Sequence, residues 1–345
     1  MREQITILGG GIIGLTCAYE LAKAGCRVTV LDHQAMGREG SWASAGILPP
    51  GNPSGVTSAL DRLRAVTVDR FPTFSRELQD RTGIDNGYRI TGGVEFLEED
   101  DLHRTELWAN EGLDFRQLDD TCFTLSGYAQ VRTPWHLRAL QAACVQLGVI
   151  LKPNTDTAEL KFDAAMKYVV ALGAWTGEWL KRFDIELRIK PMLGQILLVH
   201  NARGMDTPIV CAGKRYIVPR DSRHLLVGST EEPEAGFVKH TTEVAKAELL
   251  RFAVRHVPGA AEATVEAHWC GLRPASADGW PYIGPLPGLP NVIVAAGHFR
   301  SGVQQSVATA LLVVEWLTGA PSGLPSGPFL PSRRTISTGR AAFRS

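Results

Sequence analysis

The chain has 345 residues, of which 44% are hydrophobic, and it carries 36 basic and 36 acidic side chains. This length predicts two domains or one large domain with ample core, and the balanced charge gives no reason to expect nucleic acid or an anionic membrane as partner. The six cysteines are scattered without a C-x-x-C pair or companion histidines, so we expect reduced thiols and no metal site. Because no apolar run reaches about 18 residues and the N-terminus leads straight into an apolar segment, we expect neither a membrane span nor a signal peptide, and a cytoplasmic location.

Residues 5–32 have the pattern of a dinucleotide-binding unit. In order, the unit has a strand at 5–8, a glycine turn at 9–14, a helix to about Gly25 and a strand at 28–31. Gly9, Gly11 and Gly14 occupy the glycine positions of G-x-G-x-x-G, where side chains would block the tight turn, the approach of pyrophosphate and the packing of helix on strand. The helix N-terminus suits phosphates, and Asp32 would accept hydrogen bonds from a ribose and repel the extra phosphate of NADP. This pattern leaves NAD and FAD open.

The rest of the chain alternates between helical and strand patterns. The loop at 37–49 is rich in small residues, which let backbone and hydroxyl groups approach a large flat ligand. We then expect, in order, a helix at 60–83, strands within 88–96, a helix from 133 to about 144, a strand from 168 into a glycine turn at Gly173, antiparallel strands at 196–199, 216–218 and 225–228, a helix at 241–257, a strand at 291–296 and a helix at 303–317. Gly173 marks a second place where a nucleotide phosphate could lie.

The tail, 321–345, has four arginines and no acid. We expect a poorly ordered terminus rather than a basic arm.

The most specific motifs lie in the last third of the chain. Residues 270–284 read C-G-L-R-P-A-S-A-D-G-W-P-Y-I-G, and residues 296–302 read A-G-H-F-R-S-G. The loop at 41–48, P-x-x-G-Q at 191–195 and Y-I-V-P-R at 216–220 complete an ordered set with the glycine turn. Together these motifs resemble the amino-acid oxidases of the D-amino-acid oxidase superfamily, and most nearly glycine oxidase of thiamine biosynthesis. The resemblance runs nearly end to end and implies FAD rather than NAD.

The resemblance also implies a fold. It is an α/β architecture in which an FAD-binding Rossmann-like domain of the glutathione-reductase type carries an inserted α+β substrate domain built on an antiparallel sheet. We expect residues 1–50, 131–185 and 266–320 to form the FAD-binding domain, residues 51–130 and 186–265 to form the substrate domain, and residues 321–345 to form a C-terminal tail.

The resemblance further implies which residues contact FAD. Asp32 would hold the adenosine ribose, and Gly46, Ile47 and Leu48 would line the flavin. The run 298–304 would wrap the flavin ring, with backbone N–H groups placed to stabilise negative charge on the reduced ring. The complete expected set is Gly9, Gly11, Ile12, Ile13, Gly14, Asp32, His33, Ser41, Trp42, Gly46, Ile47, Leu48, Gly173, His298, Phe299, Arg300, Ser301, Gly302, Val303 and Gln304.

For the substrate, the resemblance implies that Arg273 anchors a carboxylate, with Arg300 and the hydroxyl group of Tyr216 assisting. A guanidinium suits this role because two parallel charge-assisted hydrogen bonds fix the direction of the carboxylate as well as its place. Transfer of hydride from a neutral amine belongs to the cofactor, so we expect no side-chain base, and we expect His298 to act in positioning. The alternative is a purely structural role, which would be an ion pair for either arginine and strand packing for Tyr216.

The implied activity is oxidative deamination of a small amino acid to the imine and then the oxo acid, with oxygen reduced to hydrogen peroxide. Glycine is the first candidate substrate, and sarcosine or a small D-amino acid the second. A dehydrogenase that passes electrons to a quinone or a partner protein, a non-catalytic flavoprotein and a homo-oligomeric assembly remain open. Two departures from the family pattern are the short segment 141–167, where no adenine contact is assignable, and the polar Gln304-Gln305-Ser306 after Gly302.

Overall fold

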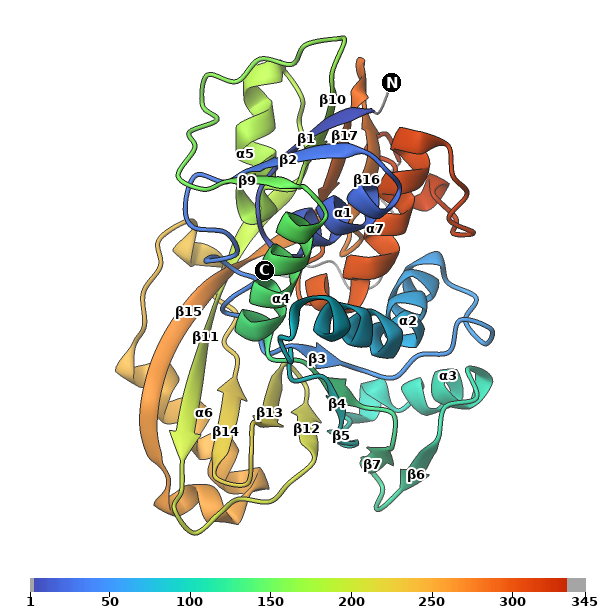
Figure 1. Cartoon of the computed structure of the whole chain (residues 1–345). Helices are drawn as coiled ribbons and strands as arrows, with labels where there is room; N and C mark the ends of the chain where they lie inside the picture. Colours follow the sequence, from blue (N-terminus) through green and yellow to red (C-terminus); the bar gives the residue numbers. More distant parts are fainter. Residues whose placement is uncertain (1–2, 334–345) are drawn as a thin grey trace.

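The computed structural model describes residues 3–333, which form two large sheets with helices packed on them (Figure 1). The smaller of these has six strands in the order β16-β17-β10-β1-β2-β9, and all neighbours are parallel except β16 and β17. Its strands are β1 (Gln4–Leu8), β2 (Arg27–Leu31), β9 (Ile150–Lys152), β10 (Lys167–Val170), β16 (Tyr282–Leu286) and β17 (Leu289–Ala296). Alternate residues of β1 enter different cores, with Ile7 on one face and Leu8 on the other. A parallel sheet buried on both faces explains the apolar runs of these strands.

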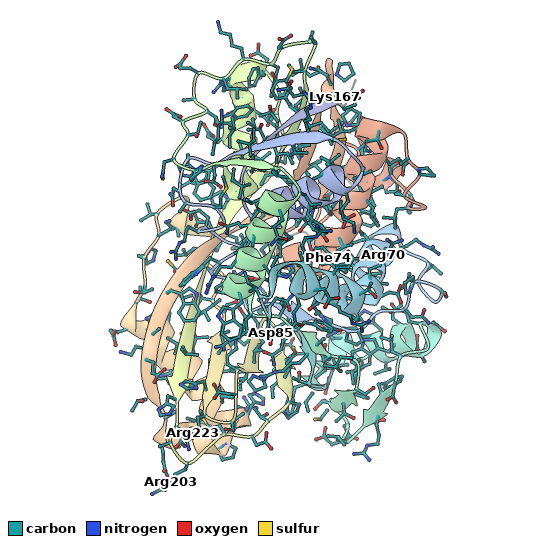
Figure 2. The ribbon with its side chains drawn as sticks, in the orientation of Figure 1. Arg70, Phe74, Asp85, Lys167, Arg203 and Arg223 are labelled. Carbon is teal, nitrogen blue, oxygen red and sulfur yellow. The ribbon has the colours of Figure 1, made fainter. Side chains whose placement is uncertain are left out.

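Four helices lie on one side of the six-stranded sheet. They are α1 (Ile12–Lys23), α2 (Ala59–Thr82), α4 (Thr133–Gln146) and α7 (Gly302–Thr318), whereas the short α5 (Thr176–Leu180) lies on the opposite side (Figure 1). Helix α2 packs on α7 and α4 rather than on the strands. The rings of Tyr19 on α1 and Phe74 on α2 meet edge to face at 5.7 Å, and Figure 2 shows Phe74 in the middle of the molecule. The packed helices fix the position of the N-terminal ends of α1 and α7.

The larger sheet has eight strands in the order β15-β11-β14-β13-β12-β5-β7-β6. Its strands are β5 (Gly93–Phe96), β6 (Phe115–Gln117), β7 (Cys122–Leu125), β11 (Ile189–His200), β12 (Ile209–Ala212), β13 (Arg215–Pro219), β14 (His224–Gly228) and β15 (Thr264–Ser276). The pairs are antiparallel as predicted, except that β5 and β12 are parallel. Helix α6 (Glu243–His256) packs Leu249 and Phe252 against one face of this sheet. The other face carries Ile196 and Val218 in a separate core.

The remaining elements are short. A three-stranded sheet in the order β3-β8-β4 joins the two parts of the molecule, and α3 lies beside the edge of the larger sheet (Figure 1). Their bounds are β3 (Ile47–Leu48), β4 (Arg89–Ile90), β8 (Ala129–Gln130) and α3 (Arg104–Asn110). The segment between α4 and β10 holds only β9, in agreement with its shortness.

The domain division remains a prediction, and two elements cross it. Helix α2 falls in the range expected for the substrate domain but packs against α7 and α4 beside the six-stranded sheet. Strand β15 starts at Thr264 and pairs with β11 along the larger sheet, although most of it falls in the range 266–320. Helix α2 has apolar residues such as Leu63 and Phe71 on the side that meets the nucleotide-binding core, which explains its place.

The expectation of a poorly ordered tail is wrong for its described part, residues 321–333. Phe329 is fully buried and lies 5.7 Å from the ring of Trp280. Arg333 donates two hydrogen bonds to the carboxylate of Asp278, at 3.0 and 2.9 Å, and both side chains are buried. The rest of the tail, with three of its four arginines, lies outside the described residues. An apolar anchor and a buried ion pair fasten this segment although it has no helical or strand periodicity.

Candidate functional site

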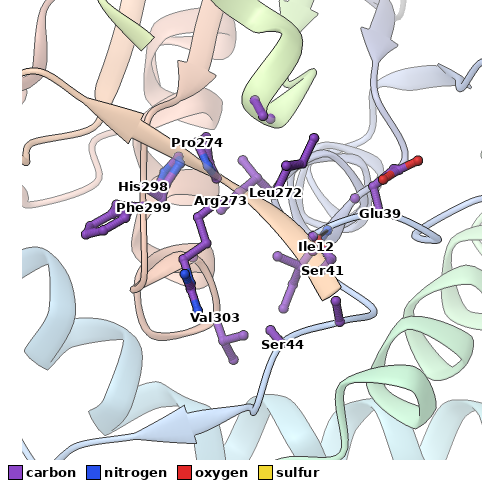
Figure 3. Close-up of a pocket in the computed structure, with 18 of the residues that line it drawn as sticks. Ile12, Glu39, Ser41, Ser44, Leu272, Arg273, Pro274, His298, Phe299 and Val303 are labelled. Carbon is purple, nitrogen blue, oxygen red and sulfur yellow. Dashed lines mark hydrogen bonds between the residues drawn. The ribbon is translucent and has the colours of Figure 1, made fainter. Parts of the chain in front are cut away.

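A cavity lies between the two large sheets, and residues from both line it (Figure 3). On the side of the six-stranded sheet it is lined by Gly11 and Asp32, and on the side of the eight-stranded sheet by Tyr216 and Arg273. The cavity therefore brings the predicted dinucleotide turn and the predicted carboxylate anchor into one space.

The turn between β1 and α1 requires glycine for conformation and for packing. Gly9 has φ 102°, and a Cβ there would lie 2.3 Å from the carbonyl oxygen of Ala171. A Cβ on Gly14 would lie 1.9 Å from the carbonyl oxygen of Gly9, so α1 approaches the turn more closely than a side chain allows. Gly14 thus supports the turn without lining the cavity, whereas Gly9 and Gly11 do line it.

The start of α1 presents hydrogen-bond donors beside the cavity. The first bond within the helix runs from the Leu15 N–H to the Gly11 carbonyl at 2.9 Å, so the N–H groups of Ile12 and Ile13 precede the helical ladder. The Ile12 N–H donates to Ser41 Oγ at 2.9 Å. The Ile13 N–H, the positive end of the helix dipole and the absence of a side chain at Gly11 fit the diphosphate of FAD.

Asp32 and two aromatic rings form the neighbouring part of the wall. Asp32 Oδ2 accepts the Gly10 N–H at 2.7 Å and Oδ1 accepts the Gln34 N–H at 2.9 Å, which orients the carboxylate and leaves further lone pairs for a ribose. The rings of His33 and Trp175 lie 6.1 Å apart, and both residues line the cavity. This region suits the adenosine part of FAD.

The loop before α7 closes the other part of the cavity. Gly297 has φ 85° and Phe299 has φ 50°, a conformation that is unusual for a side chain with a Cβ. The Phe299 N–H donates to the Pro274 carbonyl at 2.8 Å, and the Ser301 N–H donates to the His298 carbonyl at 3.0 Å. The loop delivers the N-terminal end of α7 to the cavity, where Gly302 and Val303 line it. The first bond of α7 runs from the Gln305 N–H to the Ser301 carbonyl at 2.9 Å, so the N–H groups of Gly302 and Val303 precede the helical ladder and suit an electron-rich ring.

A buried polar atom also fits the flavin. Ser44 lines the cavity, and its hydroxyl oxygen is buried without a hydrogen-bond partner among the described residues. Buried hydroxyl groups are nearly always paired, so this one is suited to a ligand. The residues present therefore fit FAD.

The Arg273 side chain projects from β15 into the cavity (Figure 3). Nη1 donates to the Thr230 carbonyl at 3.1 Å, and Nη2 donates to Ser229 Oγ. A Cβ on Gly194 would lie 2.2 Å from Nη2, so the guanidinium occupies the space that a side chain on β11 would fill. Burial is the main cause that lowers the pKa of Arg273, and the nearby Arg300 lowers it further, whereas Tyr216 and Glu231 oppose the shift. A partly buried guanidinium that, among the described residues, contacts only neutral oxygens favours an anionic ligand.

Tyr216 depends on a glycine in the same way. A Cβ on Gly228, its cross-strand partner, would lie 2.6 Å from the phenol oxygen and from two ring carbons of Tyr216. The phenol therefore lies flat across β14, on the side of the sheet that lines the cavity. Tyr216 and Arg273 thus line the same cavity, and their roles in substrate binding stay predictions.

Arg300 lines the cavity but is also engaged with the protein. Its Nη1 lies 3.0 Å from Glu231 Oε1, and its Nη2 donates to the Lys214 carbonyl. The structural interpretation left open for this arginine, an ion pair, is thus present, and a direct role in substrate binding stays a prediction.

Burial lowers the pKa of His298 to about 3, so the imidazole is neutral at neutral pH. One ring nitrogen, Nε2, lies 3.0 Å from Thr309 Oγ1 on α7, which holds the ring against the helix. This environment supports a positioning role and gives no support to an ionisable base.

Several predicted contacts lie behind the cavity wall rather than on it. Besides Gly14, these are Trp42, Leu48, Ser301 and Gln304, which are not among the lining residues. Leu48 is fully buried in the core, and the Trp42 ring lies 6.0 Å from the ring of Trp269. Gln304 Nε2 donates to the Pro49 carbonyl at 3.3 Å. The remaining expected residues, Gly9, Gly11, Ile12, Ile13, Asp32, His33, Ser41, Gly46, Ile47, Gly173, His298, Phe299, Arg300, Gly302 and Val303, line the cavity with Tyr216 and Arg273.

Some residues of the wall and its support had no role assigned from the sequence, although Gly194 and Arg220 lie within its motifs. Trp175, Gly194 and Ile196 line the cavity, and the G-A-W after β10 is the one local signal that could have indicated Trp175. Arg220 is buried and donates to the Ala45 carbonyl at 2.7 Å, which supports the loop beside Gly46. Burial lowers the pKa of Arg220 to about 9. Its support of the loop depends on a contact between distant segments, which local patterns do not show.

A family model described as FAD dependent oxidoreductase, DAO, matches residues 4–316. The chain belongs to this family. Glycine oxidase of Pseudomonas putida is 33% identical and that of Pseudomonas aeruginosa 32% identical, each match covering 97% of this chain and 100% of the relative. The crystal structure of glycine oxidase from Geobacillus kaustophilus matches with a TM-score of 0.89 at 29% identity and covers 96% of this chain and 100% of that one.

The comparisons confirm the resemblance to the D-amino-acid oxidase superfamily, the α/β fold class, FAD as the cofactor and the class of enzyme, an FAD-dependent amino-acid oxidase. Within residues 3–333, no helix combines the length and the apolar character needed to cross a membrane. The individual site residues and the domain bounds are not tested by these likenesses and stay predictions.

Proposed function

We propose that the protein oxidises glycine, with sarcosine or a small D-amino acid as further substrates, to the imine and then the oxo acid. Oxygen is the proposed electron acceptor, hydrogen peroxide the second product, and the cytoplasm the proposed location. The observation that carries the proposal is the partly buried guanidinium of Arg273, which lines the same cavity as the dinucleotide turn. The names of the relatives, glycine oxidase, support the same substrate.

The side chains of this protein bind and orient the amino acid. Arg273 has donors for two parallel bonds to the substrate carboxylate, and the Tyr216 hydroxyl group adds a donor beside it. Apolar groups of Ile47, Ile196 and Val303 line the same cavity and would help to exclude water from a bound substrate. When bound, FAD supplies the acceptor for the hydride and the route of electrons to oxygen.

No side chain is required to take the proton of a neutral amine. His298 is held neutral by burial and contacts Thr309 through Nε2. The side chains therefore contribute by recognising the substrate carboxylate and by orienting the α-hydrogen of the substrate for transfer.

The substitution Arg273→Met tests the anchor. A charge-assisted pair contributes roughly 1.5 to 3 kcal/mol, so kcat/KM for glycine should fall at least about 10- to 100-fold. The variant should also lose its preference for amino acids over simple amines of similar size, while FAD binding and folding stay nearly intact.

Arg203→Met is the matched control. Arg203 pairs with Glu262 at 2.7 Å at the far end of the larger sheet, where Figure 2 labels it. This variant should keep the kinetics of the unmodified protein. A folded, flavin-loaded Arg273→Met protein that retains its affinity for a carboxylate inhibitor would place the anchor on another residue.

A further inference from the structure

Three consecutive residues after β14 hold the two arginines of the cavity. Ser229 Oγ and the Thr230 carbonyl accept hydrogen bonds from Arg273, and Glu231 Oε1 lies 3.0 Å from Arg300 Nη1. The other carboxylate oxygen of Glu231, Oε2, lies 2.8 Å from Lys214 Nζ. The single carboxylate of Glu231 thus lies between two cations, and it is placed by the same segment that places the anchor.

The surroundings of these groups differ in exposure. The Glu231 side chain is 13% exposed and that of Arg300 30%, whereas that of Lys214 is 74% exposed and reaches solvent. Ion pairs shielded from water interact more strongly than exposed ones, so the Glu231–Arg300 contact is the stronger of the two. Arg300 therefore has its charge compensated, whereas neutral oxygens contact Arg273.

Four charged groups lie in or next to this side of the cavity. Arg273 and Arg300 are cations that line it. The anion Glu231 and the cation Lys214, on the turn before β13, are not lining residues and are connected to the cavity through the ion pair of Glu231 with Arg300. Glu231 directly follows Thr230, whose carbonyl accepts a hydrogen bond from Arg273, so its carboxylate is held near both arginines; consistent with this, Glu231 raises and Arg300 lowers the pKa of Arg273. A ligand anion bound at Arg273 consequently lies within the field of Glu231.

We propose that Glu231 is a specificity-determining residue that restricts the site to substrates with one carboxylate. Its ion pair with Arg300 leaves Arg273 as the arginine that binds the substrate carboxylate. Its negative charge also repels a second carboxylate on the same substrate. Juxtaposed like charges disfavour a wrong ligand more than they affect a neutral one. This inference rests on the proposed function, because it assigns the anchor to Arg273, and it deepens that function by excluding acidic amino acids.

The test measures ligand binding in the FAD-loaded protein by the change in the flavin absorption spectrum. Acetate reports on the anchor, and malonate is compared with malonamate, which has the same size but an amide in place of the second carboxylate. In the unmodified protein, malonate should bind at least about tenfold more weakly than malonamate. In Glu231→Gln the ratio of the two dissociation constants should shift by about tenfold or more toward malonate, because Arg300 and Lys214 are released to bind it.

Matched variants separate charge from structure. Glu231→Asp keeps the charge and should keep the discrimination, and Glu231→Ala should behave as Glu231→Gln does. Glu248→Gln removes an equal charge from an ion pair on α6, where Glu248 lies 2.8 Å from Arg215, and should leave the ratio unchanged.

The outcomes distinguish this inference from the proposed function. If Glu231→Gln and Glu231→Ala both bind acetate and both keep the ratio of the dissociation constants of malonate and malonamate, the role of Glu231 is overturned and the proposed function is not. An equal shift in Glu248→Gln also overturns the role of Glu231, because the effect would then be that of net charge. Acetate that leaves the flavin spectrum of the unmodified protein unaltered contradicts the anchor itself, and with it both proposals.

Discussion

Gly194 on β11 is required by the side chain that lies over it rather than by its own backbone. A Cβ at this position would lie 2.2 to 2.4 Å from three atoms of the Arg273 guanidinium, which is the flexible end of a long side chain. The fold can therefore accept a methyl group here if the guanidinium moves. Gly228 bears the same relation to the ring of Tyr216. The proposed carboxylate site thus depends on two residues that contribute no functional group.

Gly194→Ala should leave the protein folded and yellow but displace Arg273 from the carboxylate position. Since the lost pair contributes roughly 1.5 to 3 kcal/mol, affinity for acetate should fall about 10- to 100-fold. Titration of the flavin spectrum measures this affinity. Gly259→Ala is the control, because a Cβ there makes an ordinary contact of 3.4 Å with Met205. Unchanged acetate affinity in Gly194→Ala would show that the guanidinium does not need its present position.

At the level of elements, local patterns predicted the strands and helices well where packing and periodicity agree. The unit β1-α1-β2 and Asp32 follow the predicted order, because a glycine turn, a helix stripe and a short apolar strand each leave a local signal. Arg273 and Tyr216 were predicted through motifs, and their meeting in one cavity follows from strand pairing. The ion pair of Arg300 with Glu231 could not be predicted, since it joins residues 69 positions apart. The same holds for the buried part of the tail.

The tail segment should contribute measurably to stability. Phe329 is fully buried against the core, and truncating a buried phenylalanine costs about 3 to 5 kcal/mol. Phe329→Ala should therefore lower the free energy of unfolding in urea by this amount while kcat for glycine changes little. The exposed Leu118→Ala serves as a control for loss of an apolar side chain. A loss below about 1 kcal/mol would mean that the segment is not packed in solution.

On the scale of the whole molecule, buried histidines couple folding to pH. Burial lowers the pKa of His136 to about 3, between the rings of Phe71 and Phe74 at 5.4 and 5.7 Å. The unfolded chain binds a proton at this histidine below about pH 6.5, whereas the folded chain stays neutral there down to about pH 3. Protonation of this histidine in the unfolded chain therefore lowers the free energy of unfolding progressively as the pH falls from about 6.5 toward 3.

His136→Phe isolates this contribution. Between about pH 4.5 and about pH 6, the free energy of unfolding should depend on pH less steeply in the variant, by about 1.4 kcal/mol per pH unit. Urea unfolding at several pH values measures the slope, and only the difference in slope matters, since the variant also loses the contact with Asn86 at 3.1 Å. Parallel slopes would indicate that His136 is protonated in the folded protein.

The central claim, that this fold places an amino acid against FAD, is tested most directly by mixing the purified yellow protein with glycine in the absence of oxygen. We predict that the flavin absorption is bleached, that admission of air restores it with formation of hydrogen peroxide, and that Arg273→Met bleaches far more slowly. Restoration only over many minutes would identify a dehydrogenase that uses another acceptor. A flavin spectrum left unchanged by glycine, sarcosine and a panel of small D-amino acids would contradict the account.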